Sequence, residues 1–191
     1  MPPAEPYLVD IGGVAIAVVD VSTADEDSAN EQQAARYRQQ YAKVAGDANK
    51  PVWIAQHRPI WALETTTPKP AGDNKTLAAA AVDGFAANVA ALLSGHHHVL
   101  EVLTYERALP AQLISGHGGD DLSTGVPVKS DGMLINGVPV KRGIAKAGAF
   151  GYSLLERANT AENAPWIFSG FDYQGKLLLK CTLRGRDAVC D

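Results

Sequence analysis

Two short apolar runs that each lead to histidine constrain the fold of this chain more than any other feature. Residues 52–55 (VWIA) precede His57 and Pro59, and residues 89–93 (VAALL) precede the segment 94–98 (SGHHH). Short apolar runs bounded by glycine or proline are typical of strands, and Pro59 blocks further strand pairing. In an open α/β sheet, functional groups gather beyond the carboxyl ends of the strands. We therefore expect an α/β fold that can bring both histidine-bearing strand ends to one place.

The spacing of His96 and His98 favours a metal site. In an extended chain, residues i and i+2 point to the same face, so we expect these two rings to project together and His97 to project to the other face. Gly95 lets a ligand come close to the backbone, and imidazole is a common metal ligand. A solvated surface turn is the alternative for this segment alone, and His57 at a second strand end favours the metal site.

The remaining segments alternate between strand-like and helix-like patterns. Alanine-rich stretches without proline favour helices, and short β-branched or aliphatic runs separated by turn residues favour strands. We interpret residues 58–73 as a long loop and residues 122–147 as an irregular excursion. The predicted helices span residues 27–45 and 75–87, and the predicted strands span residues 7–11, 14–20, 52–55, 89–93, 99–104, 111–115, 150–157, 166–172 and 176–184.

Several polar and aromatic residues near the predicted strand ends allow two interpretations. Asp20 follows a strand and is either a carboxylate at the rim of the site or, as we favour, a residue that caps a loop. Trp61 lies in the long loop and either lines a substrate groove or anchors the loop by burial. We interpret Asp120 and Asp121 as solvated loop acids rather than metal ligands.

Length and composition indicate an ordinary globular chain. The chain has 191 residues, which favours one domain, and 46% of them are hydrophobic. The net charge of −4 does not indicate the basic surface that is typical of nucleic-acid binding. No apolar run reaches the roughly 20 residues that span a bilayer. Residues 1–15 show no signal peptide. The cellular location of the protein stays open, and a periplasmic or secreted location is expected only if a signal peptide lies upstream. Cys181 and Cys190 are either unrelated thiols or, as we predict, neighbours that form a disulfide.

Three segments together resemble a known enzyme family. They are residues 53–59 (WIAQHRP), residues 93–98 (LSGHHH), which contain a Gly-His-x-His signature, and residues 113–119 (LISGHGG). In order and spacing they resemble the C-terminal half of a calcineurin-like metallophosphoesterase, in the branch similar to purple acid phosphatases. The similarity extends over residues 7–183. It implies the C-terminal half of a four-layer α/β/β/α sandwich, with residues 1–191 as a single, partial domain of this family.

The chain departs from the family in its carboxylates. The family carries Asp-x-His, Gly-Asp-x-x-Asp and Gly-Asn-His-Glu or Gly-Asn-His-Asp motifs before the first of these histidines, and none of the three occurs here. The carboxylates that bridge and hold two metals are therefore absent from this sequence. We expect either a fragment of a longer protein or a natural half, with a missing N-terminal half or a self-association surface as its partner.

The resemblance assigns roles to six residues. His57 and His96 would bind one metal and His98 the other, whereas His97 would be structural. Arg58 directly follows a ligand and would pair with substrate phosphate, because a guanidinium fits that shape; a surface ion pair is the alternative. His117 follows a strand in a glycine-rich turn and could touch substrate or metal.

The function implied by the resemblance is metal-dependent phosphoester hydrolysis. Such enzymes hold two cations about 3.5–4 Å apart and use bound hydroxide as the nucleophile. The full family site would contain two divalent or trivalent ions such as Fe, Zn or Mn, and we expect this chain alone to bind at most one, weakly. The substrate would be a phosphoester. The alternative is a non-catalytic binding or structural module without the Asp-bearing half.

Overall fold

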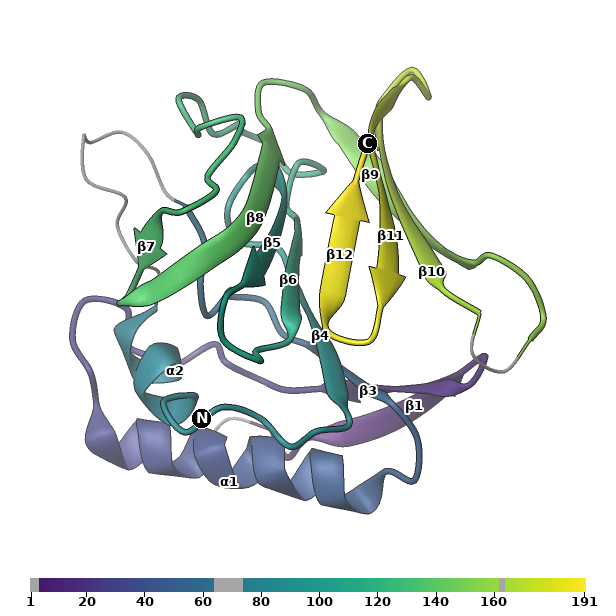
Figure 1. Ribbon diagram of the computed structural model, residues 1–191. Coiled ribbons are helices and arrows are strands. Elements are labelled where there is room, and N and C mark those ends of the chain that lie inside the picture. The colour runs from purple at the N-terminus through teal and green to yellow at the C-terminus, as the bar shows by residue number, and fades with distance from the viewer. Residues whose placement is uncertain (1–3, 64–73, 162–163) are drawn as a thin grey trace.

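The computed structural model describes residues 4–63, 74–161 and 164–191, and these residues form three layers. Figure 1 shows two helices on one side of an eight-stranded sheet and a four-stranded sheet on its other side. The fold is therefore a mixed α/β fold with few helices. The described residues form no fourth layer, so the complete four-layer sandwich stays a prediction.

The larger sheet contains the strand ends that carry the histidines. Its order is β1-β2-β3-β4-β6-β5-β8-β7, in which β2, β3, β4 and β6 are parallel neighbours and the other pairs are antiparallel. The strands are β1 (Tyr7–Ile11), β2 (Val14–Val18), β3 (Val52–Ala55), β4 (Val89–Ser94), β5 (Leu100–Tyr105), β6 (Ala111–Ser115), β7 (Leu134–Ile135) and β8 (Val138–Lys146).

The smaller sheet is an antiparallel meander at the C-terminal end of the chain. Its order is β12-β11-β10-β9. Its strands are β9 (Gly151–Arg157), β10 (Trp166–Asp172), β11 (Leu177–Arg184) and β12 (Asp187–Cys190). The first three confirm the sequence prediction, and the fourth was not predicted. Cys181 and Cys190 are paired across β11 and β12 and form a disulfide, as predicted.

The two helices bury one face of the larger sheet. Helix α1 (Glu31–Asp47) begins after Asn30, whose side chain accepts a hydrogen bond from the amide of Gln33. Its apolar stripe, which includes Tyr37 and Tyr41, packs on alternate residues of β2, β3 and β4. The opposite face of these strands packs against the smaller sheet. The inter-sheet core is formed by Trp53, Leu100, Leu113, Phe168, Leu179 and their neighbours.

The largest departures from the predicted elements are two helix boundaries and one segment. The first helix starts four residues later than expected, directly after its cap residue Asn30, and helix α2 (Lys75–Ala80) ends seven residues earlier than the predicted end at residue 87. A turn with Gly84 at a positive φ of 84° follows α2. The segment 122–147 is not irregular throughout, because it contains β7 and the nine-residue β8.

Strand β8 was missed because a proline and a glycine interrupt its pattern. Pro139 pairs with β7, a two-residue strand at the edge of the sheet, where a missing N–H is tolerated. A Cβ at Gly143 would lie 1.8 Å from the hydroxyl oxygen of Ser130 and 2.8 Å from Cδ2 of Leu103, so glycine avoids a displacement of these two side chains. Both interruptions therefore have a packing reason that only the tertiary structure shows. No helix among the described residues is long and apolar enough to cross a membrane.

Candidate metal centre

The backbone of the larger sheet brings His57 and His96 together. Strands β3 and β4 are parallel neighbours, and their pairing continues past both ends. The amide of Gln56 donates to the carbonyl of Leu93 at 3.0 Å, and the amide of Gly95 donates to the carbonyl of His57 at 3.0 Å. The imidazole Nε2 of His57 consequently lies 3.3 Å from Nδ1 of His96. This confirms that the two histidine-bearing strand ends meet at the carboxyl edge of the sheet.

The histidine segment is curled, not extended. His96 has a φ of 64°, in the left-handed region that non-glycine residues rarely adopt. The amide of His97 donates to the carbonyl of Gly95 at 2.8 Å, and the amide of Val99 donates to the carbonyl of His97 at 2.7 Å. The expectation that His96 and His98 project side by side from an extended chain is therefore wrong. The ring of His97 is mostly buried, with 8% exposure.

Glu26 is a member of the site that sequence reasoning missed. Its Oε1 lies 2.9 Å from Nε2 of His96 and 2.9 Å from a guanidinium nitrogen of Arg58. Glu26 sits in an acidic run, DED, just before α1, and such runs are typical of helix N-termini, where they complement the dipole. The contact with His96 spans seventy positions, so nothing local in the sequence could have indicated it.

Arg58 adopts the ion-pair alternative. Besides Glu26, its guanidinium donates to the carbonyl of Ala24 at 2.8 Å, and its side chain is only 24% exposed. Both contacts are made by the same nitrogen, Nη1, which a substrate would have to share with Glu26 and Ala24. The structure thus places Arg58 beside the histidines, while its role toward phosphate stays a prediction.

A buried hydrogen bond fixes the loop that carries His57. The phenol of Tyr41 donates to the side-chain oxygen of Gln56 at 2.9 Å, and the Gln56 amide nitrogen donates to the carbonyl of Arg58 at 2.8 Å. Burial raises the pKa of Tyr41, which keeps its phenol protonated and able to donate. Helix α1 therefore holds both sides of the turn around His57.

His98 and His117 are not joined to this pair. His98 is half-buried, and its ring faces Gly119, where a Cβ would lie 3.9 Å from the imidazole. His117 is 1% exposed and lies against the smaller sheet, where its carbonyl accepts from the amide of Gly151 at 2.8 Å. Neither ring nitrogen of His117 makes a well-formed hydrogen bond. Burial lowers its pKa, an effect that the nearby carbonyls of Phe171 and Tyr152 partly oppose.

The other residues with two interpretations are resolved by their contacts. Asp20 caps a loop, because its carboxylate accepts from the amides of Ala4 and Ser22. These hydrogen bonds lower its pKa. Trp61 is 2% exposed and packs on Tyr105, so it anchors its loop. Asp120 and Asp121 are exposed, as expected of loop acids.

Two nitrogens of the site have the separation that binding to one cation would impose. Two nitrogens bound to one tetrahedral zinc at about 2.0–2.1 Å lie about 3.3–3.4 Å apart, and the His57–His96 separation is 3.3 Å. Glu26 then lies on the far nitrogen of His96, where a carboxylate orients a metal-ligating imidazole and raises its basicity. Within residues 4–63, 74–161 and 164–191, however, no three His, Cys, Asp or Glu side chains are grouped so as to hold a metal ion.

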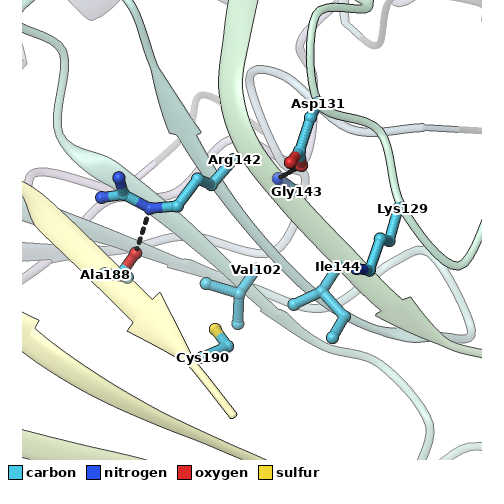
Figure 2. A pocket seen from close by; sticks show the side chains of 8 residues that line it. All are labelled: Val102, Lys129, Asp131, Arg142, Gly143, Ile144, Ala188 and Cys190. Carbon is cyan, nitrogen blue, oxygen red and sulfur yellow. Dashed lines mark hydrogen bonds between the residues drawn. The ribbon is translucent and has the colours of Figure 1, made fainter.

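Two hollows of the surface lie near elements of the large sheet. An apolar groove of about 370 Å³ borders His57 and is lined by Val18, Ala55 and Leu93. A smaller cavity of about 130 Å³ lies between β8 and β12 and contains none of the predicted site residues. Figure 2 shows Arg142 in that cavity directed to the carbonyl of Ala188.

Comparisons with known proteins support the fold alone. No family model matches the sequence, and no curated protein is similar to it. Among solved structures, the chain is similar to a purple acid phosphatase from seeds of yellow lupin (Lupinus luteus), with a TM-score of 0.56 and 12% identity. The alignment covers 97% of this chain and 32% of the lupin chain. The chain therefore spans about a third of the length of this structural neighbour.

Proposed function

We propose that this chain is the histidine-bearing part of a metal-dependent phosphoesterase of the calcineurin-like type. The observation that carries the proposal is the meeting of His57 and His96 at adjacent parallel strand ends, with nitrogens 3.3 Å apart. The likeness of the fold to a purple acid phosphatase supports it. The cofactor in the complete site would be a pair of Fe, Zn or Mn ions, and the substrate would be a phosphoester.

Each residue of this site would have a separate role. His57 and His96 would supply two neutral nitrogens to one cation, and Glu26 would hold the His96 ring by accepting a hydrogen bond from its Nε2–H. Arg58 would neutralise phosphoryl charge if it exchanges Glu26 for substrate. A bound cation lowers the pKa of water and provides the nucleophilic hydroxide. His98 would serve the second cation, and His117 would support the adjacent turn.

The isolated chain should be nearly inactive. Two cations at such short separation repel one another strongly unless anionic ligands lie between them. The described residues provide Glu26 at this site, but it is already paired with Arg58. One cation alone cannot clamp both the attacking and the leaving oxygen. The missing carboxylates would have to come from another segment or partner.

The exposed part of the larger sheet is where such a partner would pack. Tyr7, Val9 and Ile11 project from β1 on the face opposite to α1 and are 58%, 41% and 46% exposed. The apolar groove beside His57 lies at the carboxyl ends of β2, β3 and β4. A covering sheet on this face would bury apolar surface and bring its own carboxylates to the histidines.

The experiment begins with the DNA upstream of Met1. In-frame Asp-x-His, Gly-Asp-x-x-Asp and Gly-Asn-His-Glu motifs are expected, and the longest natural chain is then purified and loaded with Zn or Mn. We expect metal-dependent hydrolysis of p-nitrophenyl phosphate or its bis ester that His96→Ala abolishes, and near-background rates for residues 1–191 alone. A metal-loaded full chain that hydrolyses neither ester would refute the proposal.

A non-catalytic module is the second candidate. The observation that favours it is that Glu26 lies within ion-pair distance of both His96 and Arg58, so these side chains have a partner in the chain itself. Under this alternative a stop codon and a ribosome-binding site directly precede Met1, and the purified chain binds neither Zn nor Mn.

A further inference from the structure

Strand β9 lies at one edge of the smaller sheet. It pairs with β10 alone, in an unbroken antiparallel register that extends over all seven of its residues. At one end, the amide of Ala158 donates to the carbonyl of Pro165. At the other end, the amide of Tyr173 donates to the carbonyl of Phe150. Because the hydrogen-bonding groups of successive residues alternate between the two sides of a strand, the even-numbered residues of β9 face β10 and the odd-numbered residues face away from it.

The outward side of β9 has no strand beside it among the described residues. The amide of Gly151 donates to the carbonyl of His117 at 2.8 Å. Across residues 4–63, 74–161 and 164–191, no other segment makes a backbone hydrogen bond with Ser153 or Leu155 on this side. The hydroxyl of Ser153 lies 2.7 Å from that of Ser115, which is a contact between side chains only. The outward N–H and C=O groups of Ser153 and Leu155 are therefore a template for an incoming strand.

The sequence of β9 does not protect this edge against pairing. Edge strands are commonly blocked by lysine, by proline or by a bulge, whereas β9 (GYSLLER) has no lysine or proline and pairs with β10 without a bulge. At the other edge of the sheet, Arg142 donates from Nε to the carbonyl of Ala188, a group of β12 that points away from β11 (Figure 2). Of the two edges, β9 is therefore the one suited to strand addition.

The outer surface of β9 is apolar at its centre. The side chain of Leu155 packs on the inter-sheet core, so the even-numbered side chains lie on the outer surface of the smaller sheet. Tyr152 and Leu154 are 47% and 44% exposed there, and Glu156 is exposed next to them. A strand added at this edge would extend the outer surface and cover part of both apolar side chains.

We propose that the edge of β9 pairs with the same edge of a second copy of this chain, in an antiparallel two-fold arrangement centred on Leu154. Because the amide of Gly151 is already used, the pairing relies on Ser153 and Leu155. Centring on Leu154 sets Ser153 of each copy opposite Leu155 of the other, and each such pair exchanges both of its N–H···O bonds. The two smaller sheets then form one continuous sheet. The pairing is independent of the histidine pair and of the function proposed for it.

The side chains that meet in this register are complementary, which favours a second copy as the partner. Leu154 meets Leu154 of the second copy at a non-hydrogen-bonded position, where opposite side chains come closest. Tyr152 lies opposite Glu156 of the second copy on both sides of the axis, and a phenol can donate to a carboxylate. Centring on Leu155 instead would place Leu154 opposite Glu156, so that register loses the apolar contact.

The test is sedimentation velocity of residues 1–191 in the presence of EDTA, which excludes association through a metal ion. One pairing edge buries less than the roughly 800 Å² per partner of a stable interface. We therefore expect a weak monomer–dimer equilibrium, with a dissociation constant on the order of 10–100 µM. The His57→Ala variant should dimerise like the wild type, since its substitution lies outside this edge.

Two substitutions at Ser153 separate the backbone from the side chain. Ser153→Pro removes an outward N–H that β10 does not use, and proline is tolerated at such an edge position. It should weaken dimerisation at least tenfold, because each copy loses one hydrogen bond to the other. Ser153→Ala loses the same hydroxyl contact with Ser115 but keeps the N–H, so it should dimerise like the wild type. Circular dichroism checks that both variants are folded.

Two lysine substitutions separate the edge from the outer surface as a whole. Leu154→Lys brings two like charges together at the axis and should abolish detectable dimerisation. Leu177, which is 49% exposed on the same surface, lies in β11 and away from the edge, so Leu177→Lys should dimerise like the wild type. A wild-type chain that stays monomeric at about 200 µM, equal dimerisation of Ser153→Pro and Ser153→Ala, or equal effects of Leu154→Lys and Leu177→Lys would each overturn the proposal.

Discussion

Gly116→Ala is the substitution that tests most sharply how the histidine segment is held. A Cβ at Gly116 would lie 1.8 Å from the carbonyl oxygen of His97 and 2.8 Å from its carbonyl carbon. Both neighbours are backbone atoms, which cannot swing aside as a side chain can. The carbonyl oxygen of His97 accepts from the amide of Val99 at 2.7 Å, so its displacement breaks the curl that orients His96.

The magnitude follows from the size of this clash. The backbone around His97 must retreat by roughly 1.2 Å to reach the shortest tolerated contact, and we place the cost at about 3 kcal/mol, the upper end of the overpacking range. With an m-value of about 2 kcal/mol/M, the midpoint of urea unfolding should fall by about 1.5 M. Metal binding at His57 and His96 should weaken in the same variant.

Gly95→Ala is the matched control. Gly95 lies in the same segment, and a Cβ there would have no atom within 4 Å. Its φ is not positive, so alanine fits the backbone. We expect a change in unfolding free energy within about 0.5 kcal/mol. A Gly116→Ala midpoint equal to that of the wild type, or an equal loss for Gly95→Ala, would refute the close approach of His97 to Gly116.

Two further predictions concern stability. The Cys181–Cys190 disulfide joins residues nine positions apart, and its reduction should lower the free energy of unfolding by up to about 2.6 kcal/mol. Urea unfolding with and without reductant measures this difference, and identical unfolding curves would argue against the bond. The lowered pKa of His117 means that the unfolded chain binds more protons below about pH 6.5. Stability should therefore fall as the pH drops through this value, with a slope of up to about 1.4 kcal/mol per pH unit from this one group, and His117→Leu should be less acid-sensitive. Equal slopes in the two proteins would show that His117 stays neutral in both states or titrates freely in the fold.

The sheet and its histidine pair could be predicted because their signals are local. Apolar runs that end in glycine or proline mark β3 and β4, and parallel neighbours place their carboxyl ends at one edge. The curl at His96 could not be predicted, because its positive φ depends on contacts with the neighbouring loop and with Gly116. Local sequence patterns indicate which residues form strands, but they do not indicate how the connecting turns pack.

Long-range packing decided the residues that sequence reasoning missed or misplaced. Glu26 reaches His96 only because the segment before α1 passes over the carboxyl ends of the strands. His117 follows a strand, as a site residue would, yet the smaller sheet covers it. The strand β8 contains Gly143, which is typical of a strand break in the sequence but here makes room for the side chains of Ser130 and Leu103. Each outcome depends on segments far apart in sequence.

The most direct test of the metal centre is a calorimetric titration of Zn²⁺ into residues 1–191 at pH 7.5. The account predicts one weak site that is lost in His57→Ala and in His96→Ala, is retained in His98→Ala, and fades below about pH 6.5 because ligating histidines must be neutral. Two tight sites, or one site that survives both His57→Ala and His96→Ala, would contradict the claim that these two histidines form the centre.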